Sequence, residues 1–248
     1  TTELSINTKV YSAKALNREL ITPEFVQAAK TISASAKIDV IAQASAIESI
    51  GATTEQSAQE TKQSEQVDQD KQQKDVAIIT TDFGDMVVEF FEGVAPKHVE
   101  SFKLHAQNGY YNGTLFHRVI PGFMIQGGDP NTKTDNKASY GTGGHAAKYF
   151  GVGNESEPTT WNVPAEFNDI NHSRGILSMA RANDPNSGGS QFFICAADAP
   201  HLNGKYTVFG QLIKGDQVLE QIVNLPRDAR DNPTRRVEMS VRLDKIDN

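Results

Sequence analysis

The spacing of apolar side chains divides the chain into two kinds of structure. Within 25–36, apolar residues recur every three or four positions, which is the spacing of one face of a helix. Thr22 followed by Pro23 is a helix start signal, because the hydroxyl caps free amide groups and proline fits the first helical turn. Gly51 is a natural C-terminal stop. We therefore expect two or three short helices in an α-helical extension covering 1–51.

The next stretch, 52–74, is polar throughout. It is rich in glutamine and charged residues, and Val67 is almost its only large apolar side chain. Such a segment buries too little surface by itself to offset the entropy lost on ordering. We expect a solvated linker helix or a disordered tether, with a domain boundary near residue 75.

From Val76 onward the apolar period changes to two. VAIITT and MVVEFF flank a turn at 82–85, which predicts a β-hairpin. Helices are expected to begin at Pro96 and Asp216. Between them lie short β-like pieces separated by Gly, Pro and Asn: TLFHRVI, GFMIQGG, GILSMA, SQFFICA and YTVFGQLI. Many short strands without strand-helix alternation predict a mainly β domain over 75–248, an antiparallel barrel or sandwich rather than a doubly wound sheet.

Composition sharpens this division and excludes several classes of protein. Gly51 is the only glycine before residue 75, whereas the other 18 of the 19 glycines follow it, as a turn-rich domain requires. With 38% hydrophobic residues and no apolar run near the ~18 residues that span a bilayer, membrane insertion is not expected. A formal net charge of -7 argues against nonspecific nucleic-acid binding, since phosphate contacts depend on clustered Lys and Arg.

The residues that could support covalent or metal chemistry lack the neighbours or the spacing that such chemistry requires. Cys195 lies in a continuous apolar run with no adjacent cation, which favours a buried and unreactive thiol. His98 and His105 share a helix face, but seven residues place them roughly 10 Å apart, too far to share one zinc ion. Ser190 lacks the second glycine of a nucleophile elbow. No metal and no cofactor are expected.

Three unusual segments remain: FHRVIPGFMIQGGD at 116–129, SMARANDPNSGGSQFFI at 178–194 and LNGKYTVFG at 202–210. Together they resemble the signature of the cyclophilins, which are peptidyl-prolyl cis/trans isomerases. The similarity extends from about Val76 to Ile246 in the family's order and spacing. It implies an eight-stranded antiparallel β-barrel closed by two α-helices, in agreement with the pattern of strands and helices above.

The resemblance also implies a site, position by position. Arg118 matches the catalytic arginine, and Gln126 matches the glutamine that orients it. The apolar pocket for the proline ring corresponds to Phe123, Met124, Phe193 and Leu202. The other substrate-binding positions are Ala180, Arg181, Ala182, Gln191, His201 and Tyr206.

Two of the matched positions depart from the commonest family pattern. His201 stands where cyclosporin-sensitive members carry tryptophan, so the resemblance implies weak cyclosporin binding. Tyr206 stands where many members carry histidine, a difference familiar among bacterial-type members. The stretch 181–185 is one residue longer than the commonest motif, and 145–163 is longer than in minimal members.

The implied function is an isomerase that acts on proline-containing peptides or unfolded proteins and assists their folding. An alternative is a chaperone or scaffold module with little catalytic role, motivated by the helices expected in 1–51. Those helices would serve client binding, docking on the barrel or self-association, because their apolar stripe must be buried. No leader precedes Thr1, so a signal peptide is either absent or already removed. A removed leader favours a periplasmic or otherwise exported protein over a cytoplasmic one, and the Gln-rich, cysteine-poor composition is compatible with export.

Overall fold

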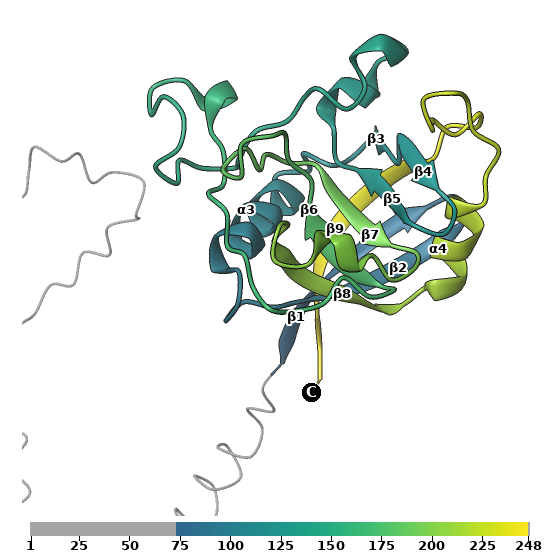
Figure 1. Ribbon diagram of the computed structural model, residues 1–248, viewed down its shortest axis with the longest axis horizontal. Coiled ribbons are helices and arrows are strands. Elements are labelled where there is room, and N and C mark those ends of the chain that lie inside the picture. The colour runs from purple at the N-terminus through teal and green to yellow at the C-terminus, as the bar shows by residue number, and fades with distance from the viewer. Residues whose placement is uncertain (1–72, 248) are drawn as a thin grey trace, which may run out of the picture. The chain divides into compact units, whose positions relative to one another are not determined.

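The computed structural model describes residues 73–247. The helices expected within 1–51 lie outside the described residues, as does the polar segment 52–74 apart from its last two positions. The first strand begins at Lys74 and pairs with the last strand, so that Lys74 lies opposite Ile246. The two ends of the described domain therefore lie side by side (Figure 1).

Within residues 73–247, nine strands form one antiparallel sheet in the order β3-β9-β1-β2-β8-β6-β7-β5-β4 (Figure 1). Their bounds are β1 (Lys74–Thr81), β2 (Gly84–Phe90), β3 (Thr114–Leu115), β4 (Arg118–Ile120), β5 (Met124–Gly127), β6 (Ile176–Met179), β7 (Phe192–Cys195), β8 (Val208–Lys214) and β9 (Glu238–Ile246). The hairpin predicted around 82–85 is formed by β1 and β2. The predicted fold class, mainly β and antiparallel, is confirmed.

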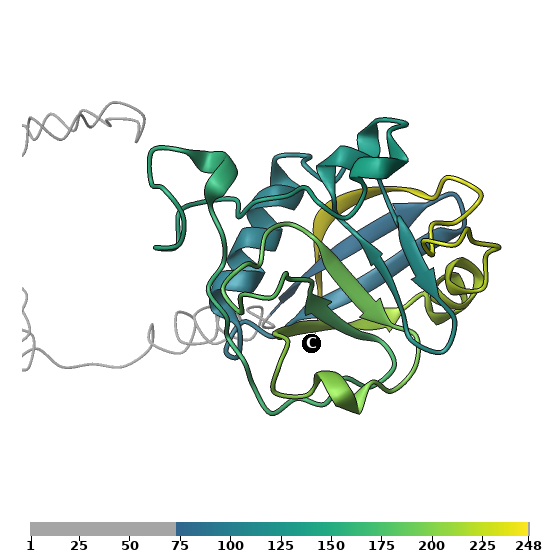
Figure 2. The ribbon, with the colours of Figure 1, turned by 45° about the horizontal axis from the view of Figure 1, so that its top comes forward.

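The segment 114–120 joins the two ends of the curled sheet. It was expected as one strand but contains two, β3 and β4, which stand at opposite ends of the strand order. Between them the Phe116 amide donates to the Val237 carbonyl beside β9, and the His117 amide donates to Gln126 in β5. This change of partner raises the strand count of the described domain from the expected eight to nine and closes the barrel seen in Figure 2.

Two α-helices, α3 (Pro96–Gln107) and α4 (Asp216–Val223), lie at opposite sides of the curled sheet (Figures 1 and 2). Both begin at the predicted residue. Each buries one face against the strands, with Phe102 of α3 and Leu219 of α4 almost fully covered. The connecting loops of the described domain contain short 3-10 helices: η2 (Pro130–Lys133), η3 (Lys137–Ser139), η4 (Pro158–Thr160) and η5 (Pro200–Leu202).

Strand β7 separates two apolar clusters. All four of its residues are buried, and successive side chains point to opposite faces of the sheet. Phe192 and Ile194 pack into the barrel core together with both helices. Phe193 and Cys195 belong to a second cluster on the other face, which includes Met124 of β5. The apolar residues that are continuous in the sequence therefore alternate between two separate clusters.

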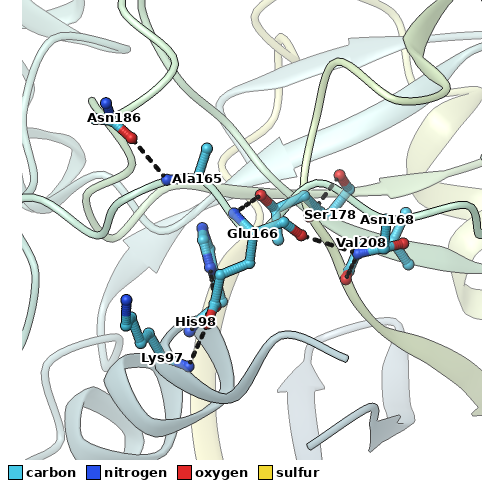
Figure 3. A network of polar contacts seen from close by, with 9 residues as sticks. Lys97, His98, Ala165, Glu166, Asn168, Ser178, Asn186 and Val208 are labelled. Atoms are coloured by element: carbon cyan, nitrogen blue, oxygen red, sulfur yellow. Dashed lines mark hydrogen bonds and ion pairs between the residues drawn. The ribbon is translucent and has the colours of Figure 1, made fainter. Parts of the chain in front are cut away.

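The start of α3 is capped by a residue distant in the sequence. Ala95 occupies the N-cap position and offers no side-chain acceptor. Glu166 supplies one: Oε1 accepts the Lys97 amide at 3.2 Å, and Oε2 accepts the His98 amide at 3.0 Å (Figure 3). His98 Nδ1 also lies 2.6 Å from Glu166 Oε2. The carboxylate satisfies free amides at the positive end of the helix dipole and joins α3 to the loop before β6.

We expect Glu166→Gln to destabilise the protein by about 1 kcal/mol at pH 7, the usual cost of losing an N-cap. Burial raises the pKa of Glu166, but hydrogen bonds from the His98 side chain and from the His98 and Lys97 amides outweigh it and hold the pKa below its ordinary 4.5. A lowered folded-state pKa means that this stabilisation is present above about pH 4.5 and is lost as the pH falls through the folded-state value.

Urea unfolding of the wild type and of Glu166→Gln between pH 3 and 7 measures the difference in their free energies of unfolding. Glu100→Gln is the matched control, because Glu100 is a half-exposed glutamate on the same helix whose one ion pair within residues 73–247 is with Lys148. If the difference in free energy of unfolding between wild type and Glu166→Gln stayed constant down to pH 3, the ionised Glu166 carboxylate would not be the stabilising cap of α3.

Candidate active site

The register of three neighbouring strands brings polar and apolar side chains to one face. Arg118 in β4 lies opposite Gln126 in β5, and Gln126 lies opposite Phe193 in β7. Directly opposite residues of antiparallel strands point to the same face, so these side chains converge. Met124, two positions before Gln126, shares that face because the side-chain period of a strand is two. All four line one cavity of about 580 Å³.

The cavity has an apolar side and a cationic side. Its lining consists of His117, Arg118, Phe123, Met124, Gln126, Tyr140, Gly141, Ala180, Arg181, Phe193, His201, Leu202, Tyr206, Arg230 and Asn232. On the apolar side, Met124, Phe193 and Leu202 are each at most 7% exposed. The Phe123 ring lies 5.4 Å from the His201 ring, and Tyr206 meets Phe193 edge-on at 6.0 Å. A compact apolar group bound there would sit beside the Arg118 guanidinium.

A chain of side-chain amides supports Arg118. Its Nη1 lies 3.4 Å from Gln126 Oε1, and the Gln126 amide nitrogen donates to Gln191 Oε1 at 2.9 Å. The Gln191 amide nitrogen in turn donates to the Gly143 carbonyl at 2.7 Å. The orientation of Gln126, and through it that of Arg118, is therefore tied to the backbone of a loop.

That loop is organised around the buried carboxylate of Asp129. Its Oδ1 accepts the Asn131 amide at 2.8 Å, and its Oδ2 accepts the Gly141 amide at 2.5 Å. The backbone at Gly143 passes so close that a Cβ there would lie 2.5 Å from Asp129 Oδ1. Glycine is required at this position so that the carbonyl that holds Gln191 can approach.

A second cavity of about 290 Å³ shares Gln126 and Arg181 with the first and adds Ala182 and Gln191. On the rim between the two cavities, the Arg181 guanidinium lies over the Tyr206 ring, 4.5 Å from its centre. Every residue that the resemblance assigned to the site lines one of these two cavities. The structure thus brings the separated motifs together.

Some lining residues come from outside the motifs. Arg230 and Asn232 belong to the segment 226–234, which no periodicity or motif marks as part of a site. Its place beside β4 depends on the closure of the barrel, which local patterns do not reveal. His117 also lines the cavity, and its position next to Arg118 in FHRVI was a signal that could have identified it.

The titratable groups that the sequence singled out have separate structural partners. His98 binds Glu166, whereas His105 Nε2 lies 2.8 Å from the His145 carbonyl, and burial lowers the pKa of His105 to about 4. In the described range 73–247, no three His, Cys, Asp or Glu side chains are grouped so as to hold a metal ion. In that same range, no helix has the length and apolar character needed to cross a bilayer.

Comparison with known proteins identifies the family. The model of the family "Cyclophilin type peptidyl-prolyl cis-trans isomerase/CLD" matches residues 76–242. A probable peptidyl-prolyl cis-trans isomerase of Brucella abortus is 38% identical over 164 residues, covering 65% of this chain and 79% of the relative. One from Arabidopsis thaliana is 39% identical over 166 residues, covering 64% and 89%. A cyclophilin-type isomerase of Cryptosporidium parvum, crystallised in the presence of the dipeptide Ala-Pro, is 35% identical with a TM-score of 0.59, covering 70% and 99%.

The chain belongs to the cyclophilin-type peptidyl-prolyl cis-trans isomerase family. The family predicted from the three motifs is confirmed, and with it the class of enzyme. The barrel with its two helices is the fold of the cyclophilin relative of known structure.

We expect Cys195 to be inert in the folded protein. It is fully buried, and burial, with a smaller contribution from Asp198, raises its pKa to about 12. It then carries about a thousandfold less thiolate than an exposed cysteine of pKa 9 at the same pH. A chromogenic disulfide reagent should detect no thiol in native protein at pH 8 and one thiol after unfolding in urea. Rapid modification of native protein with loss of activity would contradict this expectation.

Proposed function

We propose that this chain accelerates rotation about Xaa-Pro bonds in extended, proline-containing polypeptides and so assists their folding, with Arg118 as the catalytic residue. One observation carries the assignment of roles: a guanidinium held by Gln126 stands beside an apolar wall in the same cavity. Family membership provides the class of reaction, and the cavity provides groups suited to each part of it.

Isomerisation of a prolyl bond needs no nucleophile and no proton transfer, because no covalent bond is made or broken. The barrier of ~20 kcal/mol comes from amide resonance, and the uncatalysed exchange takes tens to hundreds of seconds. In the twisted transition state the prolyl nitrogen regains its lone pair and becomes a hydrogen-bond acceptor. A fixed guanidinium donor at Arg118 therefore binds the transition state more tightly than the planar ground state.

The apolar wall holds the proline ring while the preceding residue rotates. Burial of the ring against Phe123, Met124, Phe193 and Leu202 is the same in both isomers, so it strengthens binding without lowering the barrier. Its contribution to rate is to anchor one side of the bond at a fixed distance from Arg118. The rest of the substrate extends over the rim formed by 180–182 toward the second cavity.

The expected substrates are proline-containing peptides and unfolded proteins. The Cryptosporidium parvum relative was crystallised in the presence of Ala-Pro, which supports the proline pocket as the recognition element. Slow prolyl isomerisation limits many folding reactions, so an enzyme of this class acts on chains that are not yet folded.

We expect Arg118→Ala to lower kcat/KM roughly 10- to 150-fold, the loss that corresponds to one charge-assisted hydrogen bond. Arg118→Lys should restore little activity, because an ammonium lacks the planar fork that Gln126 holds. A coupled isomerisation assay with a proline tetrapeptide measures the effect. Arg242→Ala serves as the control, since Arg242 is an exposed arginine on β9 that pairs with Asp244 and lines neither cavity. Wild-type activity in Arg118→Ala would refute the proposed role.

We expect this protein to bind cyclosporin weakly and His201→Trp to tighten that binding about tenfold or more. Relative to tryptophan, His201 has a smaller aromatic face and lacks the indole donor at the edge of the cavity. Inhibition titrations of wild type and variant provide the measurement. Wild-type inhibition as tight as that of a tryptophan-bearing cyclophilin would contradict the prediction.

A further inference from the structure

The strand that carries Arg118 is short and lies at the edge of the strand order. β4 spans only Arg118–Ile120, and β5 is its one strand partner in the described part of the chain. The segment 226–234 covers its other edge, where the Val119 amide donates to the Asp231 carbonyl at 2.9 Å. The backbone next to Arg118 is therefore held from both sides.

Asp231 adopts a backbone conformation that side chains of L-residues rarely take. With φ of 64°, it is the one non-glycine residue with positive φ within residues 73–247. A conformation of this kind costs free energy and persists only where the surrounding structure imposes it, and such residues concentrate at functional sites.

Contacts that do not involve the Asp231 side chain maintain the shape of the loop. Asp228 Oδ1 accepts the amides of Arg230 at 2.8 Å and Asn232 at 3.0 Å. The Asp231 amide itself donates to the Asp228 carbonyl at 3.0 Å. The loop can therefore keep its conformation when the carboxylate of Asp231 is removed.

The carboxylate of Asp231 lies between two arginines. Its Oδ2 is 3.7 Å from Arg118 Nε, and its Oδ1 is 3.1 Å from Arg227 Nε. Gln126 approaches the same Arg118 guanidinium at a different nitrogen, Nη1. Asp231 thus lies at Nε of the guanidinium and Gln126 at Nη1. Within the described residues Nη2 has no hydrogen-bond partner, so it is available to donate to substrate.

We propose that Asp231 is a positioning residue for Arg118, and that Arg227 in turn holds the Asp231 carboxylate in place. This inference rests on the proposed function. Gln126 and Asp231 fix the guanidinium at two points, so that its free donor meets the prolyl nitrogen as the bond twists. The strained backbone at Asp231 is what directs the carboxylate toward β4 instead of solvent.

The geometry favours a role in orientation over a role in stability. The Arg118 and Asp231 side chains are 42% and 32% exposed, and ion pairs with that exposure contribute little to the free energy of unfolding. Catalysis is more sensitive, since the rate depends on how often the donor and the reacting nitrogen are aligned. Loss of the carboxylate should therefore change turnover and leave stability almost unchanged.

Asp231→Asn and Asp231→Gly test the proposal, because both residues accept a left-handed backbone and both remove the charge. We expect kcat to fall about threefold to fivefold in each variant with KM unchanged. The urea midpoint should stay the same in Asp231→Asn and should not fall in Asp231→Gly, because glycine adopts the positive φ without strain. Exchange NMR on a proline peptide separates the rate of rotation on the enzyme from binding. Asp82→Asn is the matched control: it removes the carboxylate of another exposed pair, with Arg235, at a turn that lines neither cavity.

A double-mutant cycle tests whether Asp231 affects kcat through Arg118. If Asp231 acts through Arg118, then Asp231→Asn causes no further loss in the Arg118→Ala background. Unchanged kcat in Asp231→Asn, an equal loss in both backgrounds, or a loss that parallels reduced stability would each overturn the proposal. An active wild type with a fully active Asp231→Asn removes this inference alone, whereas an inactive wild type removes the proposed function as well.

Discussion

The site depends on the register of β4, β5 and β7. Because Arg118, Gln126 and Phe193 lie directly opposite one another across these strands, a donor, its support and an apolar surface share one face of the sheet. A slip of one residue in any of these pairings would turn one member toward the opposite face. Backbone hydrogen bonds thus determine the spatial arrangement on which the chemistry relies.

The second requirement is that the apolar floor of the cavity and the barrel core remain distinct. In β7, Phe192 and Phe193 are neighbours in sequence but belong to different clusters. The barrel core packs both helices against the sheet and supplies rigidity. The outer cluster includes Met124 and Phe193, which line the cavity and are carried by strands β5 and β7, together with Leu202 of η5.

Local patterns were sufficient to predict the β1-β2 hairpin and the starts of both helices, since each depends on residues close together in sequence. The family resemblance of the three motifs named many of the residues that line the two cavities, but not His117, Arg230 or Asn232. Non-local contacts were not predictable in this way. The division of 114–120 into two strands depends on Val237 and Gln126, and the cap of α3 comes from Glu166, 68 residues after His98. Asp231 and Arg118 are 113 positions apart in the sequence, and only the tertiary fold places their side chains together.

The pairing of Lys74 with Ile246 has a consequence for how this domain can be combined with others. Because the chain enters and leaves at one place, the domain can be inserted into a loop of an unrelated protein with both connections at a single point. The same proximity permits circular permutation: a short linker can join the two ends, and new ends can be opened in an exposed loop. The adjacent ends therefore allow this isomerase domain to be joined to other proteins in more than one way.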